Sequence, residues 1–365
     1  MKHVVAVCRE CLNYDSREVY DVNVMVLVHN SGHYASRIGW MKQLGLINIR
    51  TLKVHITVVA SLGDGEQMAE LTEGWPAGTQ VTVLEMASSC ALPKIHAYYL
   101  WLRDSALKAR WHLRVDDDSV TDLFAMFTYA ENRFGDAPIH LMTSPMSHEI
   151  GQPRFGDFLA LKKIVLPSMT HEYECSMTSR SAMNAVLESE TACRFLEETG
   201  GQLDAPGDRG LAIAMQMIGI PVARNPVGNK DFAKTELILA GGHLAHIHYV
   251  DWGDDIFTNM LAAFAYGERR AVDRETVAAL AGRGLEFGRC VGERLRELCL
   301  AADGTIENPL HDHETSWHFA QGCLFLKHRD GSVTSIFNTL LLHRHRAWIM
   351  GPYLHGDIQH YLRIR

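Results

Sequence analysis

The first 145 residues alternate short β-branched runs with longer amphipathic stretches, and this alternation constrains the fold more than any other feature. A β-α-β-α order predicts a parallel sheet covered by helices, and such sheets bind ligands beyond the carboxyl ends of their strands. We therefore expect an α/β fold, with strands and helices at the following positions. The strands are at 22–28, 53–60, 80–85, 111–115 and 138–143, and the helices at 34–44, 64–72, 92–109 and 120–132.

The middle of the chain is less regular. A strand at 175–178 is expected to lead into a helix from Ser181, and a helix at 211–218 is expected to end at Gly219. Apolar residues at helical spacing predict one long amphipathic helix over 272–300.

The last part of the chain has a different pattern. Asp330-Gly331, between apolar runs at 323–327 and 332–336, predicts a β-hairpin, and further strands are expected at 338–350 and 358–364. We therefore divide the chain into three parts. These are an α/β domain at 1–265, a helical connector at 266–302 and a small β-rich appendage at 303–365.

The charge balance excludes several classes of partner. The chain of 365 residues has 35 Lys and Arg against 43 Asp and Glu, a net charge of −8. Nucleic-acid binding needs a local basic excess, so no nucleic-acid partner is expected. No apolar run approaches the about 18 residues of a membrane span, and residues 1–11 do not resemble a secretory signal. With eight thinly spread cysteines, typical of reduced thiols, we expect a cytoplasmic protein.

The sharpest local signal is a run of three acids, Asp116-Asp117-Asp118, directly after the apolar strand at 111–115. Adjacent carboxylates repel each other unless they are solvated or neutralised by a cation. At the exit of a parallel strand they face the ligand crevice, and their hard oxygens suit Mg²⁺ or Mn²⁺ bridging to a diphosphate. The simpler alternative is a solvated helix cap, with Asp118 and Ser119 as the capping residues.

The segment Val115-Asp116-Asp117-Asp118 resembles the DxD motif of GT-A glycosyltransferases, particularly the fringe and β-1,3-galactosyltransferase type. The resemblance implies a Rossmann-like domain that binds a nucleotide-diphospho-sugar. It also implies that Asp118 binds the divalent metal and that Asp116 and Asp117 lie nearer the ribose or sugar. Members of this type are membrane-anchored in a secretory organelle. Because no membrane span is expected in this sequence, we expect a bacterial-type soluble relative instead.

Three later segments extend the resemblance over roughly residues 20 to 255. Residues 176–182 are similar to the strand-to-helix segment that contacts donor and acceptor. Residues 206–211 are similar to the acidic segment before a helix, which implies Asp208 as the catalytic base, although Gly207 departs from a commoner second acid. The late His246-Ile247-His248 is similar to the family's metal-binding histidine.

The residues themselves allow both functional and plain structural interpretations. A carboxylate at a helix N-terminus, such as Asp208, is stabilised by the helix dipole, but it could be a simple N-cap. In an extended segment His246 and His248 share one face and could complete a metal site, or they could be ordinary packed or surface histidines. Asp64 could hold uracil or ribose or cap a helix, and Lys94 and Arg114 could contact the diphosphate or be solvated.

The expected function is metal-dependent, inverting transfer of galactose or an N-acetylhexosamine-like sugar from a UDP-sugar to a hydroxyl of a glycan or lipid-linked saccharide. Mn²⁺ or Mg²⁺ would be the cofactor. A lipid-linked acceptor would bring the protein to the inner membrane face. The candidates for contact with anionic lipid there are Arg344, Arg346, Trp348, Arg363 and Arg365. Two alternatives stay open. One is a haloacid-dehalogenase-like phosphatase with Asp116 as nucleophile, and the other is a non-enzymatic glycan-binding protein.

Overall fold

The structure is a computed structural model, and its contacts divide the chain into two compact units. Unit 1 comprises Met1–Lys230 and Ala245–Val250, and unit 2 comprises Asp231–Leu244 and Asp251–Arg365. The structure describes residues 6–7, 17–28, 34–60, 70–85, 91–142, 175–200, 210–224, 246–247, 262, 267–289, 294–307, 313–343, 346–355 and 358–364.

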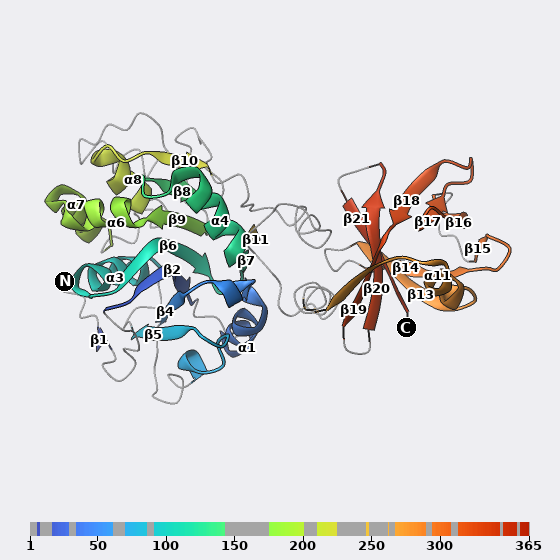
Figure 1. Ribbon diagram of the computed structural model, residues 1–365, viewed down its shortest axis with the longest axis horizontal. Coiled ribbons are helices and arrows are strands. Elements are labelled where there is room, and N and C mark those ends of the chain that lie inside the picture. Colours follow the sequence, from blue (N-terminus) through green and yellow to red (C-terminus); the bar gives the residue numbers. More distant parts are fainter. Residues whose placement is uncertain are drawn as a thin grey trace. The chain divides into compact units, whose positions relative to one another are not determined.

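Unit 1 is built on an eight-stranded sheet with the order β1-β5-β4-β2-β6-β9-β8-β10 (Figure 1). The strands are β1 (Ala6–Val7), β2 (Val19–Leu27), β4 (Val54–Ala60), β5 (Gln80–Glu85), β6 (Lys108–Asp116), β8 (His140–Met142), β9 (Cys175–Ser179) and β10 (Val222–Arg224). Six of them lie close to expected strands, whereas β1 and β10 correspond to none of the strands that the sequence indicates.

Most strands of this sheet run in one direction. β2 is parallel to both β4 and β6, β4 is parallel to β5, and β8 is parallel to β10. β9 is antiparallel to its two neighbours β6 and β8, so β8 and β10 point the same way as β6. The carboxyl ends of these six strands therefore meet at one edge of the sheet.

Helices cover both faces of the sheet, as buried apolar residues on both sides of β2 require. Val22, Val24 and Val26 belong to the core under α1 and α4, whereas Met25 and Leu27 belong to the core under the other helices. In Figure 1, α3, α6 and α7 lie to the left of this sheet and α1 and α4 to its right. The helices are α1 (Tyr34–Trp40), α3 (Ala91–Asp104), α4 (Leu123–Phe134), α6 (Arg180–Glu188), α7 (Glu190–Gly200) and α8 (Gly210–Met217).

Two expected helices are shorter than the sequence pattern indicates. The helix expected at 92–109 ends at Asp104, because Lys108 already begins β6. The helix expected at 120–132 begins only at Leu123, because residues 120–122 form a strand of a second, three-stranded sheet. The helix expected at 64–72 lies outside the described residues up to position 69.

A buried polar network crosses the sheet beneath α3. The His55 ring bonds with Nδ1 to Asn23 Oδ1 at 2.9 Å and with Nε2 to Thr82 Oγ1 at 3.0 Å. Asn23 Nδ2 donates to the Tyr98 hydroxyl at 2.7 Å, which lies 3.5 Å from His112 Nδ1. Burial and then the charge of His112 lower the pKa of His55 to about 3, and burial and then the charge of Arg180 lower the pKa of His112 to about 3. Both imidazoles are therefore neutral in the folded protein at neutral pH.

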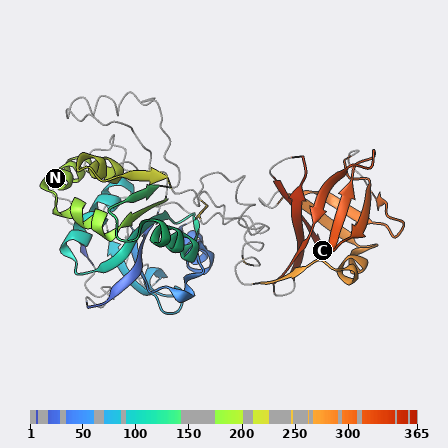
Figure 2. The same ribbon diagram turned by 45° about the horizontal axis from the view of Figure 1, so that its top comes forward.

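Unit 2 is an antiparallel sheet that curls until its edges meet (Figure 2). Its main path is β15-β14-β13-β21-β20-β18-β17-β16, and a bridge between Thr305 and Ser316 joins the two ends. Its elements are β12 (Glu268–Ala271), α11 (Arg274–Leu280), β13 (Gly284–Arg289), β14 (Arg294–Leu300), β15 (Ile306–Glu307), β16 (Ser316–Ala320), β17 (Cys323–Lys327), β18 (Val333–Phe337), β19 (Thr339–His343), β20 (Arg346–Tyr353) and β21 (Ile358–Ile364).

The hairpin expected around Asp330-Gly331 is present. β17 and β18 pair in antiparallel fashion across it, and Gly331 has the positive φ of 86° that such turns favour. The single strand expected at 338–350 is instead divided into β19 and β20, which pair with each other.

The long helix expected over 272–300 is wrong, and so is the helical connector at 266–302. Among the described residues of this range only α11 is helical, because Asp273 caps its start and Gly282, with a φ of 75°, lies just beyond its end. The apolar residues that follow alternate with period two, Leu285 with Phe287 and Leu298 with Leu300, and are buried in the core of unit 2. Gly284–Arg289 and Arg294–Leu300 therefore form β13 and β14 of the same sheet as the expected appendage.

The aromatic residues of unit 2 have distinct positions. Trp348 and Tyr361 are fully buried, so the expectation that Trp348 contacts lipid is wrong. Arg363 Nη2 lies 2.7 Å from the buried carboxylate of Glu286. None of the helices in the described ranges is long and apolar enough to cross a lipid bilayer.

A glycine in β20 allows a close approach of two backbones in this sheet. A Cβ at Gly351 would lie 1.7 Å from the carbonyl oxygen of Ile336 and 2.8 Å from Phe337 Cα, both backbone atoms. We expect Gly351→Ala to destabilise unit 2 by about 3 kcal/mol, the upper end of the cost of overpacking. Gly284→Ala is the matched control, because nothing lies within 4 Å of its Cβ. Equal melting temperatures of the two variants in calorimetry would contradict this packing.

Candidate functional site

The three acids that stand out in the sequence lie at the carboxyl end of β6. Asp116 is the last residue of the strand, and the backbone N–H of Asp117 donates to the Leu27 carbonyl at the end of β2 at 3.1 Å. Asp116, Asp117 and Asp118 are 5%, 0% and 7% exposed. Buried carboxylates at the functional edge of a sheet are costly, so something in the site must stabilise their charge.

The position of these acids is the point at which the order of strands reverses. In chain order, β4 and then β5 are added on one side of β2, and β6 then pairs with β2 on its other side. The helices of these connections lie on opposite faces, since α1 after β2 packs in one core and α3 before β6 in the other. The ends of β2 and β6 therefore flank a topological switch point, where open α/β sheets bind ligands.

Two arginines face the acids. Arg37 Nη1, from α1, lies 3.5 Å from Asp117 Oδ1 and 3.8 Å from Asp118 Oδ2. Arg114 Nη2, from β6 itself, lies 3.9 Å from Asp116 Oδ1. These ion pairs are longer than the about 2.7–2.9 Å of a charge-assisted hydrogen bond. Among the described residues, these pairs set three carboxylates against two guanidinium groups.

Arg37 was not among the residues that the sequence indicated. The sequence feature that could have indicated Arg37 is its position in α1, the first helix after β2. In a doubly wound sheet this helix packs beside the switch point.

The capping alternative for the acids is wrong. The cap of the following helix α4 is Asp122, whose Oδ1 accepts from the Ala125 N–H at 2.9 Å. Asp122 Oδ2 also accepts from Asn48 Nδ2 at 2.6 Å. Asp118 and Ser119 are separated from α4 by β7 (Val120–Asp122), so they do not cap it, and their burial shows that they are not solvated.

The late histidine segment comes to the same place through the three-stranded sheet (Figure 1). β11 (His246–Ile247) pairs with β7, with His246 opposite Thr121 and Ile247 opposite Val120, and β3 (Leu46–Ile47) pairs with β7 on its other side. The backbone of His246 thus lies beside the strand that begins two residues after Asp118. Segments about 125 residues apart in the sequence are joined at this site.

The other expected site residues have varied outcomes. Lys94 Nζ is buried and donates to the Val28 carbonyl at 2.6 Å, which ties α3 to the end of β2 near the acids. Contacts of Lys94 and Arg114 with a diphosphate stay predictions. Asp64, Asp208 and His248 lie outside the described residues.

The donor set agrees with a hard divalent cation. Mg²⁺ in enzymes is commonly held by one or two carboxylates plus substrate phosphates and water, so a complete protein cage is not required. Within the described ranges, no group of three or more His, Cys, Asp or Glu side chains is arranged to hold a metal on its own. The fully buried Ser119 hydroxyl has no hydrogen-bond partner in that same part of the chain, so it is a further oxygen ligand candidate.

Comparison with known proteins adds no family to this description. The chain matches none of the protein-family models, and no curated protein is significantly similar to it. The geometry of the site therefore carries the functional argument.

Proposed function

We propose that this protein is a metal-dependent glycosyltransferase that moves a sugar from a UDP-sugar to a hydroxyl group of a glycan or lipid-linked saccharide. The observation that carries the proposal is the set of three buried carboxylates at the switch point between β2 and β6. Nucleotides bind at this position in open α/β sheets. A nucleoside diphosphate and these acids are both negative, so a cation between them is what makes their approach favourable.

The arrangement supports different roles for the three acids. Asp118 and the buried Ser119 lie beyond the strand end and are the candidate metal ligands, with His246 on the neighbouring β11. Asp116 pairs with Arg114, and the backbone N–H of Asp117 donates to the Leu27 carbonyl, so both positions are fixed, as suits groups that orient ribose or sugar hydroxyls. When bound, Mn²⁺ or Mg²⁺ would neutralise the charge of the departing diphosphate.

The attacking hydroxyl must lose a proton during transfer. The resemblance assigns this role to Asp208, which would take the proton while the bond between the anomeric carbon and the diphosphate oxygen breaks, with inversion. This assignment stays a prediction, because Asp208 lies outside the described residues. We expect Asp208→Asn to abolish transfer while UDP binding in the presence of Mn²⁺ is retained, which calorimetry can measure.

The phosphatase alternative is less well supported by the topology. The nucleophilic aspartate of haloacid-dehalogenase-like enzymes normally follows the first strand of the core. Here the acids follow β6, the fourth of the parallel strands β2, β4, β5 and β6 in chain order.

A turnover assay separates these functions. The purified chain is incubated with UDP-galactose, UDP-N-acetylglucosamine or UDP-N-acetylgalactosamine, and release of UDP is measured with Mn²⁺, with Mg²⁺ and with EDTA. We expect release of UDP from one of these donors with the metals only. Turnover that is unchanged in EDTA, release of inorganic phosphate from p-nitrophenyl phosphate with a trapped phospho-aspartate, or binding of glycan without any UDP-sugar turnover would each contradict the proposal.

A further inference from the structure

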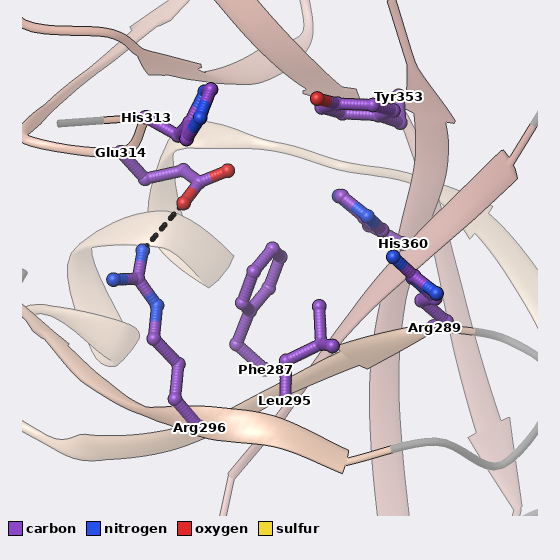
Figure 3. A pocket seen from close by; sticks show the side chains of 8 residues that line it. All are labelled: Phe287, Arg289, Leu295, Arg296, His313, Glu314, Tyr353 and His360. Carbon is purple, nitrogen blue, oxygen red and sulfur yellow. Dashed lines mark hydrogen bonds and ion pairs between the residues drawn. The ribbon is translucent and has the colours of Figure 1, made fainter. Parts of the chain in front are cut away.

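Unit 2 has a pocket of its own, with a volume of about 270 Å³, at one end of its curled sheet (Figure 3). The pocket lies where β13 and β20 end and where β14 and β21 begin, because these neighbouring strands are antiparallel. A closed sheet commonly binds a small ligand at such a mouth. The volume is near the lower end of the about 300–1,000 Å³ typical of small-molecule sites, which is suitable for a single ring.

The inner face of the sheet changes in character at this mouth. Side chains alternate between the two faces of a strand, so His360 of β21 shares the inner face with the core residue Leu362. In the same way Arg296 of β14 shares this face with the core residue Leu298. A bulge in the pairing of β13 with β14 leaves Leu295 without an opposite residue on β13, and Leu295 also lines the pocket. The interior of unit 2 is therefore apolar in its middle and polar at the mouth.

Aromatic rings form the floor and one wall of the pocket. The Phe287 and His360 rings meet edge to face with centroids 4.8 Å apart, and Tyr353 lies against His360, also at 4.8 Å. His360 is fixed in place by a 2.9 Å hydrogen bond between its Nδ1 and the Ser335 hydroxyl. A ligand with an apolar face can pack on these rings.

Two polar atoms of the pocket can bond to a ligand. Glu314 Oε2 accepts from Arg296 Nη2 at 2.7 Å in an almost fully buried pair, and the other carboxylate oxygen of Glu314 points toward the middle of the pocket (Figure 3). The hydroxyl end of Tyr353 is directed toward the side that Glu314 occupies. Within the described part of the chain, neither this hydroxyl nor that second oxygen has a hydrogen-bond partner. Arg289 also lines the pocket but already has a partner, so the site does not depend on its charge.

The electrostatics of the pocket disfavour a charge of either sign. The pocket-facing oxygen of Glu314 belongs to a carboxylate, which repels an anion. Burial and then the charges of Arg289 and Arg296 lower the pKa of His360 to about 4, so the aromatic wall lies in a positive potential that repels a cation. A neutral ligand with hydroxyl groups avoids both repulsions, because a hydroxyl can donate to the carboxylate and can bond either way with a tyrosine hydroxyl.

We propose that this pocket binds a neutral hexopyranose, one sugar unit of a glycan. A pyranose ring combines apolar C–H groups on its faces with hydroxyl groups around its edge. One face would pack on Tyr353 and Phe287, one hydroxyl would donate to Glu314, and another would bond with the Tyr353 hydroxyl. The site belongs to unit 2 alone, so the inference does not depend on the transferase activity proposed for unit 1.

Saturation-transfer NMR and calorimetry on the full chain can test this proposal. The ligands are the methyl glycosides of glucose, galactose and mannose. Each is compared with two forms that differ only at carbon 6, a uronate with a carboxylate there and a 6-amino-6-deoxy sugar with an ammonium group. Phenol probes an apolar ring with a single hydroxyl. We expect one of the neutral glycosides to bind at least about tenfold more tightly than its two charged forms and than phenol, because either charge would be desolvated without a partner.

Variants of the pocket locate the binding. Tyr353→Ala removes the ring on which the sugar packs and is expected to weaken binding at least about tenfold. Leu354→Ala is the matched control, because Leu354 is the next residue, is 49% exposed and does not line the pocket. Tyr353→Phe should weaken binding about fivefold, the usual net effect of one hydrogen bond, and it leaves the Arg296–Glu314 pair intact. Glu314→Gln should weaken binding as well, and circular dichroism would show whether each variant is folded.

Three results would overturn the proposal. They are no binding of any of the three neutral glycosides at millimolar concentration, equal or tighter binding of a charged form or of phenol, and equal effects of Tyr353→Ala and Leu354→Ala. Because UDP release by unit 1 is measured separately, loss of either site can be distinguished from loss of the other.

Discussion

Asp118→Asn is expected to reduce metal-dependent release of UDP from a UDP-sugar by about 10²–10³-fold, the usual effect of removing one group that stabilises charge in a transition state. The substitution keeps the shape of the side chain and removes one negative charge from a buried cluster of three. Because Asp118 is repelled by the neighbouring carboxylates of Asp116 and Asp117, removing its charge should leave the fold intact. Steady-state kinetics with Mn²⁺ in excess measure the effect.

Asp122→Asn is the matched control for this experiment. It makes the same chemical change four residues further along, at a residue that caps α4 and bonds to Asn48. We expect it to keep the activity and to lower the stability of unit 1 by less than about 1 kcal/mol, because Asn caps a helix about as well as Asp. If Asp118→Asn keeps full activity, or if Asp122→Asn loses as much, the acids at the end of β6 do not hold the metal.

Acidification is expected to destabilise unit 1 through His55 and His112. Both are neutral in the folded state with a pKa of about 3, whereas an unfolded histidine has a pKa of about 6.5. Above pH 6.5 neither state gains a proton, so this contribution to stability is complete. As the pH falls from 6.5 toward 3, only the unfolded state is protonated, at a cost of about 1.4 kcal/mol per pH unit for each histidine. The pair should therefore lower stability by about 4 kcal/mol between pH 7 and pH 5.

Calorimetric melting at pH 7, 6 and 5 measures this dependence for each unit. The double variant His55→Gln, His112→Gln is expected to melt lower at pH 7, because His55 bonds to Asn23 and Thr82, but with a much weaker pH dependence. His355→Gln, at an exposed position in unit 2, should leave the slope of unit 1 unchanged. Identical slopes in the wild type and the double variant would show that the two imidazoles are not buried in neutral form.

Much of unit 1 could be predicted from local sequence. Runs such as 22–28 and 53–60 are rich in β-branched apolar residues, which indicates a strand that is buried on both faces. This is the environment of a strand in a parallel sheet. The acids at 116–118 could be placed at a functional edge because a charge run directly after a buried strand must lie at its end. Their burial could not be predicted, because it depends on α1 and on β2, which pack against them from elsewhere in the chain.

The failures of prediction also arise from contacts between segments that are distant in the sequence. The apolar residues of 272–300 can be fitted to helical spacing, but beyond Leu280 they lie in strands, because β13 pairs with both β14 and β21. The pairing of His246 with Thr121 joins segments distant in sequence, and Arg37 enters the site from a helix without any motif of its own. The pocket of unit 2 depends on strand register and a bulge, which local patterns do not specify.

The most direct test of the acidic site is the position of the metal itself. A crystal of the full chain grown with Mn²⁺ and UDP, measured at a wavelength at which manganese scatters anomalously, would locate the ion without reference to activity. The predicted result is an anomalous peak in contact with the Asp118 carboxylate and with the UDP diphosphate, at the carboxyl ends of β2 and β6. A UDP molecule bound elsewhere, or acids that contact only Arg37 and Arg114 with no manganese peak beside them, would contradict the account.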